Sequence, residues 1–297
     1  MKMRKLGNTG KMISVMGYGC GGYWGYEVFD EKTADRLVHQ ALDGGVNFFD
    51  TGSSYSGGNA EKRLGKILKG VNTTGLIIGT KAGTTIRNGK LVKDYSPASI
   101  TSQVEGSLKN LGLERLPLLQ LHGLPVQGQD EVFGTLTTLK QQGKVELIGA
   151  SCDGAALENA LSFDTLDVVM LTYNLIEKHA KLKIEKAYSQ GVGVLVKSPL
   201  AHTLYSNDLF KIRKLSDIWY LLRVMKNYRS QVMKGRKYRF ISDIPGWSAH
   251  EIALLYALQE KVSCVVTGTT NLEHMKRNIL TFERELPSDI QKRIDAI

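Results

Sequence analysis

Cysteine is scarce in this chain, and its three copies do not form a metal-binding pattern. Cys20, Cys152 and Cys264 form no C-x-x-C pair and have no metal-like spacing with histidine. Such scattered cysteines argue against a structural zinc site and indicate a reducing compartment. We therefore expect no metal.

Long apolar runs are absent as well. The basic opening MKMRKLGNTG is not followed by an apolar segment of signal-peptide length. No window approaches the roughly 18 consecutive apolar residues that a membrane span requires. We therefore expect a cytoplasmic protein that does not enter a membrane. Linkers, repeats and low-complexity tracts are also lacking, so residues 1–297 are expected to form one domain.

Short apolar runs recur along the chain and alternate with segments of helical spacing. The runs lie at 15–19, 46–49, 76–80, 116–121, 145–150, 167–172, 192–196 and 263–267. Their length of about five residues and their lack of polar alternation are typical of strands buried on both faces of a parallel sheet. Helical spacing is found at about 31–45, 59–69, 97–111, 130–143, 154–161, 178–190, 248–261 and 271–280.

Eight strand–helix units in a chain of this length predict an α/β fold, a (β/α)₈ TIM barrel. A doubly wound open sheet is the alternative, but no G-x-G-x-x-G follows the first strand. The stretch around Asn8, Thr9 and Gly10 is expected to form an N-terminal hairpin that plugs the bottom of the barrel. One irregular segment, at about 201–247, lies between the seventh strand and its helix.

The net charge of +10 is concentrated within this irregular segment. Residues 211–239 contain ten Lys and Arg and one acid, Asp217. Three roles are open for this basic segment: a helix packed on the barrel with solvated cations, guidance of an anionic cofactor or substrate, or docking to nucleic acid or an acidic protein. Nothing in it resembles a nucleic-acid-binding motif, so nucleic acid is not the expected partner.

Four polar residues follow three neighbouring strands, at the end where barrel enzymes carry their active sites. Asp50, Lys81 and His122 end the second, third and fourth strands, and Tyr55 lies in the loop after the second. Each alone has a structural interpretation, such as a turn cap or a solvated strand end. Their convergence on one rim favours catalysis.

The chemistry of these four side chains supports that grouping. Tyrosine, with a pKa of about 10, is a poor acid at neutral pH, and a nearby lysine ammonium lowers that pKa. Asp50 can keep Lys81 charged, and His122 can orient a carbonyl oxygen. We therefore predict that Tyr55 is a general acid that protonates an oxygen as charge develops on it.

Across nearly the whole chain, the sequence resembles the aldo-keto reductases. The motifs that carry the resemblance are LGNTGKMIS, NFFDTGSSY, GTKAG, LQLHG, IGAS, VKSPL and GTTNLEHMKRNI. It implies an oxidoreductase that reduces an aldehyde or ketone by hydride transfer from a nicotinamide cofactor. It also implies that Tyr55 is the acid, that Lys81 and Asp50 tune it, and that His122 orients the substrate. Members bind their cofactor without the missing glycine fingerprint; NADPH is expected here, with NADH as the alternative.

The stretch GTTN (268–271) stands at the start of a helix, where it reads either as a helix cap or as a phosphate cradle. The resemblance favours the cradle and implies that the adenosine end of the cofactor lies near this motif and the following helix. The residues concerned are Gly268, Thr269, Thr270, His274 and Asn278. Lys276 and Arg277 are the nearest cations for a 2′-phosphate.

At the nicotinamide end the sequence departs from the family pattern. Ser151 is kept, but Cys152 stands where relatives carry asparagine, and Met170 where they carry glutamine. Lys197 replaces the usual ring-stacking tyrosine; Ser198 and Leu200 of the same motif complete the expected contacts. Weaker cofactor binding is therefore a second hypothesis. Cys152 is a nucleophile in principle, but without an activating base a packing role is favoured.

The substrate is expected to be a small carbonyl compound, and two features bear on its character. Tyr23 and Trp24 can form an apolar wall, and Thr84 stands where many relatives place a bulky aromatic, which predicts a wider mouth and a bulky substrate. The basic segment allows an anionic one. The rival function is a catalytically weak barrel that acts as a binding or regulatory protein through that segment.

Overall fold

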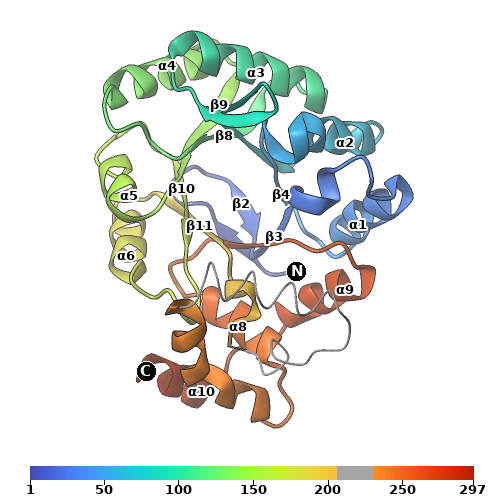
Figure 1. The fold of residues 1–297 in the computed structure, drawn as a ribbon, viewed down its shortest axis with the longest axis vertical. Coiled ribbons are helices and arrows are strands. Elements are labelled where there is room, and N and C mark those ends of the chain that lie inside the picture. The colour runs from blue at the N-terminus through green and yellow to red at the C-terminus, as the bar shows by residue number, and fades with distance from the viewer. Residues whose placement is uncertain (206–229) are drawn as a thin grey trace.

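The computed structural model, which describes residues 1–205 and 230–297, contains a closed barrel of eight parallel strands (Figure 1). Going around the barrel, the strands follow one another in chain order, and the last pairs with the first. They are β3 (Met16–Gly19), β4 (Phe48–Asp50), β5 (Ile77–Ala82), β8 (Leu116–His122), β9 (Val145–Ser151), β10 (Val168–Thr172), β11 (Gly193–Lys197) and β12 (Cys264–Thr267).

The helices surround this barrel on its outside (Figure 1). Those described are α1 (Glu31–Asp43), α2 (Asn59–Leu68), α3 (Pro97–Leu111), α4 (Gln129–Gln141), α5 (Gly154–Ala160), α6 (Lys181–Ser189), α8 (Ala249–Ala257), α9 (Leu272–Thr281) and α10 (Ser288–Asp295). The arrangement confirms the predicted (β/α)₈ barrel. Each of the eight predicted strands is a barrel strand, with ends that differ by no more than two residues.

Local sequence signals explain why individual helices begin and end where they do. The Ser96 hydroxyl accepts a hydrogen bond from the Ser99 backbone N–H, and Pro97 occupies the first turn of α3. Gly112 ends that helix in the left-handed conformation, with φ of 68°. Ser248 and Glu251 form a capping box at the start of α8.

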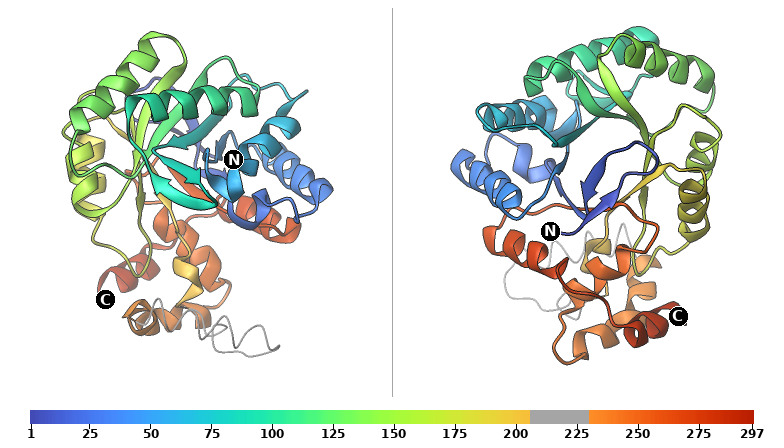
Figure 2. Two further views of the ribbon diagram at one scale, coloured as in Figure 1. Left: turned by 45° about the horizontal axis from the view of Figure 1, so that its top comes forward. Right: turned by 180° about the vertical axis from the view of Figure 1, so that it is seen from behind.

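The predicted N-terminal hairpin is present and closes one end of the barrel. It consists of β1 (Met3–Lys5) and β2 (Met12–Ser14), and Figure 2 (right) shows it across the barrel from behind. Leu6 and Ile13 are fully buried in the apolar cluster inside the barrel, with Phe48, Leu118 and Met170 among its members. The interior is therefore packed at this end, and a site can form only at the opposite, C-terminal end of the strands.

Several elements were not predicted in the sequence analysis, although Asn88-Gly89 is a typical two-residue hairpin turn. A second hairpin, β6 (Thr84–Arg87) and β7 (Lys90–Lys93), follows β5, and α10 ends the chain. Of the irregular segment at 201–247, the described parts hold the 3₁₀ helices η3 (Ala201–Thr203) and η5 (Arg236–Asp243). The basic segment at 211–239 falls mostly outside the described residues, so its three candidate roles stay open. Over 1–205 and 230–297, no helix is long and apolar enough to cross a bilayer.

Candidate active site

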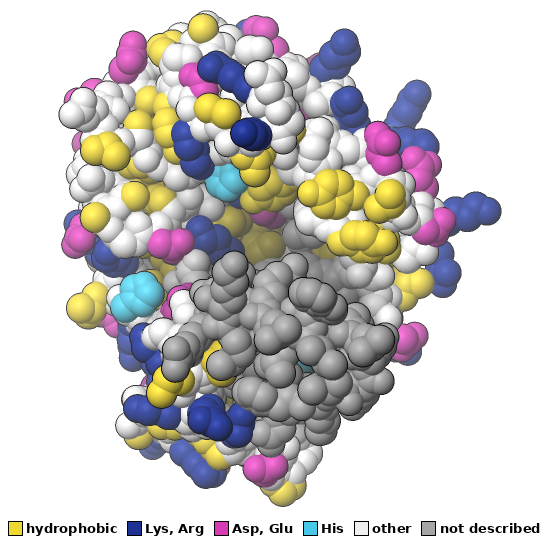
Figure 3. Space-filling view, in the orientation of Figure 1, with side chains coloured by type: hydrophobic (Ala, Val, Ile, Leu, Met, Phe, Trp, Pro, Cys, Tyr) yellow, Lys and Arg dark blue, Asp and Glu magenta, His cyan; other side chains and the backbone are white. Residues whose placement is uncertain are grey.

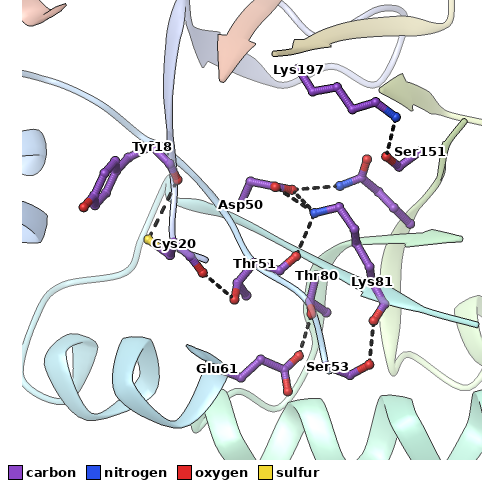
Figure 4. A network of polar contacts seen from close by, with 11 residues as sticks. Tyr18, Cys20, Asp50, Thr51, Ser53, Glu61, Thr80, Lys81, Ser151 and Lys197 are labelled. Carbon is purple, nitrogen blue, oxygen red and sulfur yellow. Dashed lines mark hydrogen bonds and ion pairs between the residues drawn. The ribbon is translucent and has the colours of Figure 1, made fainter. Parts of the chain in front are cut away.

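Asp50 and Lys81 form a buried ion pair at the C-terminal ends of β4 and β5 (Figure 4). The Lys81 ammonium donates to both carboxylate oxygens of Asp50, at 2.6 and 2.7 Å, and to the Thr51 carbonyl at 2.8 Å. These contacts hold the ammonium in place beside Tyr55. Burial acts to lower the pKa of Lys81, but the charges of Asp50 and Tyr55 and the hydrogen bonds to both together outweigh it and leave that pKa above its ordinary value. Lys81 is therefore a fixed, permanently charged ammonium.

Tyr55 lies directly over this ammonium, in the loop after β4. The Lys81 Nζ atom is 4.8 Å from the centre of the Tyr55 ring. Two glycines make room for the ring: a Cβ atom at Gly21 would come within 2.6 Å of it, and one at Gly52 within 3.0 Å. The phenol is therefore held in one place by backbone on two sides, which explains the glycines that surround it in the sequence.

The pKa of Tyr55 corrects one expectation. The sequence predicts a lowered pKa because of Lys81, and the charge of Lys81 does act in that direction. Burial of the phenol has the larger effect, however, and Asp50 adds to it, so the pKa of Tyr55 lies above its ordinary value of 10.0. Tyr55 is accordingly a protonated phenol over the whole neutral range.

His122, at the end of β8, faces Tyr55 from the other side. The centres of the two rings are 5.8 Å apart and the rings meet edge to face. Its Nδ1 atom is buried without a partner among the described residues, and burial, with the charges of Lys93, Lys81 and Lys197, lowers the pKa of His122 to about 4. At neutral pH the imidazole is uncharged, so it can offer one N–H donor and one acceptor to a ligand.

Gln120 is a residue of this site that the sequence analysis missed. It is fully buried on β8, and its Nε2 donates to Asp50 Oδ1 at 3.1 Å. Gly149 on the next strand leaves it room, because a Cβ atom there would lie 2.9 Å from Gln120 Cγ. Gln120 thus orients the carboxylate that holds Lys81. The available signal was its place two residues before His122, which puts both side chains on the same face of the strand.

Polar groups between β5 and the helices α2 and α3 hold β5 in position. Glu61 of α2 is completely buried and accepts hydrogen bonds from Thr80 and Ser107. Thr80 precedes Lys81, so this contact ties the strand that carries the ammonium to α2 and α3 (Figure 4). The Ser53 hydroxyl also donates to the Lys81 carbonyl, at 2.9 Å.

Residues predicted for the nicotinamide end lie at the ends of β9, β10 and β11. The Lys197 ammonium is 3.4 Å from Ser151 Oγ and forms an ion pair with Asp153 at 3.0 Å. Cys152 is buried, and burial raises the pKa of its thiol to about 12, which disfavours the thiolate that a nucleophile requires. Met170 is also buried, within the apolar cluster inside the barrel.

The other predicted cofactor residues follow β11 and β12. The Ser198 carbonyl accepts a hydrogen bond from the Asn174 amide, and Leu200 packs on the outer apolar core. Asn271 caps α9 by accepting from the His274 backbone N–H at 3.0 Å. Asn278 is buried, and its Oδ1 atom lies 2.7 Å from His250 Nε2. Its side chain is thus already engaged inside the protein.

Comparison with known proteins identifies the family to which this architecture belongs. Residues 15–297 match the model of the Aldo/keto reductase family. The chain belongs to the aldo-keto reductases. They are oxidoreductases that use nicotinamide cofactors and act on small carbonyl compounds.

Individual relatives agree with this assignment. The chain is 31% identical to L-galactose dehydrogenase of Arabidopsis thaliana over 70% of this chain and 68% of that protein. It is 26% identical to the uncharacterized oxidoreductase YrpG of Bacillus subtilis, over 100% and 96% of the two chains. It is similar in structure to the holo form of aldo-keto reductase AKR11C1 from Bacillus halodurans, with a TM-score of 0.84 and 27% identity over 100% and 96% of the two chains.

The residues of this aldo-keto reductase fit a nicotinamide dinucleotide at its phosphate end. A Cβ atom built on Gly268 would meet nothing closer than the Gly19 carbonyl at 3.8 Å, so the strand end is open there. Thr269 and Thr270 add hydroxyls, and α9 begins directly afterwards with its positive dipole end. At the nicotinamide end the fit is sparser: Ser151 and Lys197 are polar, whereas Cys152 and Met170 offer no amide.

The mouth of the barrel differs from the expectation in one side chain. Tyr23 is 60% exposed, but Trp24 is buried, packed edge-on against Tyr18 at 6.2 Å. The predicted apolar wall therefore contains Tyr23 alone, because Trp24 belongs to the core. Arg63 holds this loop by donating to the backbone carbonyls of Trp24 and Phe29.

Proposed function

We propose that this protein reduces an aldehyde or ketone to an alcohol, with Tyr55 as the general acid. The observation that carries the proposal is the convergence of Tyr55, the Asp50–Lys81 ion pair and His122 at one end of the barrel. A protonated phenol lies between a fixed ammonium and a neutral imidazole, an arrangement that suits an oxygen on which negative charge develops.

Each residue has a distinct part in this mechanism. The bound nicotinamide cofactor supplies the hydride. Tyr55 donates its phenolic proton to the carbonyl oxygen, and the Lys81 ammonium beside the ring stabilises the phenolate that remains. Asp50, oriented by Gln120, holds that ammonium, and His122 donates a hydrogen bond that orients the oxygen. Water can then restore the proton to Tyr55 after product release.

The pH dependence of this reaction follows from the two titrating groups. Reduction requires protonated Tyr55, whose pKa is raised above 10.0, and neutral His122, whose pKa is about 4. We expect kcat/KM for reduction to stay level across the neutral range, to fall above pH 10 as Tyr55 loses its proton, and to fall towards pH 4 as His122 gains one. A steady-state pH profile measures both limbs. A decline centred between pH 6 and 8 would contradict this assignment.

We propose NADPH as the cofactor in preference to NADH. Lys276 and Arg277 are exposed on α9, near the residues proposed for the adenosine end, and can pair with a 2′-phosphate. Ser151 and Lys197 would hold the carboxamide, and Gly268, Thr269 and Thr270 the phosphates. The Tyr95 ring packs against Gly83, next to Thr84, and the bulky substrate expected from Thr84 stays a prediction.

A fluorescence titration with each dinucleotide tests this cofactor assignment. We expect NADPH to bind more tightly than NADH, and Arg277→Met to weaken NADPH binding about tenfold with little effect on NADH, since a charge-assisted hydrogen bond is lost. Lys292→Met removes one exposed charge from α10 and is the control. If neither dinucleotide binds, the rival function as a binding protein replaces this proposal.

A further inference from the structure

The β6–β7 hairpin that follows β5 places Lys93 at the mouth of the barrel. In the β6–β7 pairing Lys93 lies opposite Thr84, and its ammonium donates to the Thr84 hydroxyl at 2.8 Å. The same ammonium donates to the backbone carbonyl of His122. The charge is thereby placed against the strand end that carries the catalytic imidazole.

Two glycines shape the rim around this lysine. A Cβ atom at Gly123 would lie 3.5 Å from Lys93 Nζ and 3.0 Å from the Tyr95 hydroxyl, and one at Gly83 would lie 2.5 Å from the Tyr95 ring. The Tyr95 hydroxyl also donates to the His122 carbonyl, at 3.0 Å. Lys93 is exposed, but its contacts with Thr84 and the His122 carbonyl hold its ammonium against the rim.

The charge of Lys93 has no counter-ion in the described structure. Three nearby carboxylates are engaged elsewhere: Asp50 with Lys81, Asp153 with Lys197 and Asp94 with Arg87. Lys93 itself forms no ion pair with any residue of 1–205 or 230–297. Lys and Arg side chains border the hollow on this face of the molecule (Figure 3).

One N–H donor of the Lys93 ammonium has no partner among the described residues. The ammonium has three N–H groups, of which the Thr84 hydroxyl and the His122 carbonyl take two. Burial, and then repulsion from Lys197, lower the pKa of Lys93, and an anion beside it would relieve that repulsion. A single N–H can donate one charge-assisted hydrogen bond to a carboxylate oxygen.

We propose that Lys93 binds a carboxylate on the substrate, so that the preferred substrates are aldehydes or ketones that carry a carboxylate group. The inference rests on the proposed function, because the carbonyl must reach Tyr55 and His122 while the carboxylate reaches Lys93. It assigns to the hairpin a role in substrate selection that the barrel strands do not provide.

The test compares two aldehydes that differ in charge, 4-carboxybenzaldehyde and its neutral methyl ester. We expect Lys93→Met to lower kcat/KM for the carboxylate about tenfold, the effect of losing a charged hydrogen bond, and to change the ester by less than about twofold. Lys90→Met, in the same hairpin and equally a loss of one charge, is the control and should leave both substrates unchanged. An equal loss for the two aldehydes in Lys93→Met would overturn the proposal, since Lys93 would then only support His122. Unchanged rates would overturn it as well.

A binding measurement tests the carboxylate subsite at Lys93 independently of catalysis. Calorimetric titration of the wild type, Lys93→Met and Lys90→Met with 4-(hydroxymethyl)benzoate, the alcohol product, should show a loss of about tenfold in affinity in Lys93→Met alone. Equal affinity in all three proteins would overturn the subsite. If the wild type reduces neither aldehyde but binds this anion through Lys93, the subsite stands and the proposed carbonyl reduction fails.

Discussion

Replacement of Tyr55 by phenylalanine is expected to lower kcat for carbonyl reduction by at least about 100-fold, the usual contribution of a general acid. The phenyl ring keeps its place between Gly21 and Gly52 and its edge contact with His122, so only the hydroxyl group is removed. The rate is measured as NADPH oxidation with 4-carboxybenzaldehyde and with its methyl ester. The midpoint of urea unfolding should change little.

Tyr95→Phe is the matched control for that variant. Tyr95 is also a phenol at the mouth of the barrel, but its hydroxyl donates to the His122 carbonyl and lies against Gly123. Its loss removes a hydrogen bond without removing the proposed acid, so kcat should change by only a few fold. Full activity in Tyr55→Phe, or an equal loss in both variants, would show that Tyr55 is not the acid.

Lys81→Met is expected to abolish detectable reduction and also to destabilise the fold by roughly 3–5 kcal/mol, because it leaves a buried carboxylate without its partner. Among the described residues, Asp50 would keep the Gln120 amide as its side-chain donor. Its charge, no longer balanced, would raise the pKa of Tyr55 further and disfavour the phenolate that reduction leaves behind. Urea unfolding and steady-state kinetics measure the two effects separately.

A double variant separates catalysis from stability. In Asp50→Asn/Lys81→Met both charges are removed, so the unpaired buried carboxylate no longer exists and much of the lost stability should return. Activity should not return, because the ammonium beside Tyr55 is still missing. Recovery of the reduction rate together with stability would indicate that Lys81 acts only through the fold.

The fold and the four central residues could be predicted from the sequence for a simple physical reason. Strands buried on both faces must be continuous apolar runs, and the helices between them must be amphipathic, so both leave periodic local patterns. In a parallel barrel all strand ends lie on one face, and this places Asp50, Lys81 and His122 together before any contact is known. The cofactor residues after β9 to β12 were inferred from the family resemblance, and their roles stay predictions.

Tertiary structure alone decided the properties that depend on neighbours distant in the sequence. The sequence indicated that Lys81 acts on Tyr55, but the net direction of the Tyr55 pKa depends on how deeply the ring is buried. Trp24 lies in a glycine-rich loop, where the sequence suggested an exposed aromatic. In the structure it packs into the core against Tyr18. Asn88-Gly89 is a local signal for the hairpin that carries Lys93, but the position of Lys93 against His122 depends on how the hairpin packs on the barrel. Periodicity determined where the chain forms strands and helices, and long-range packing determined which side chains lose water and which charges remain unpaired.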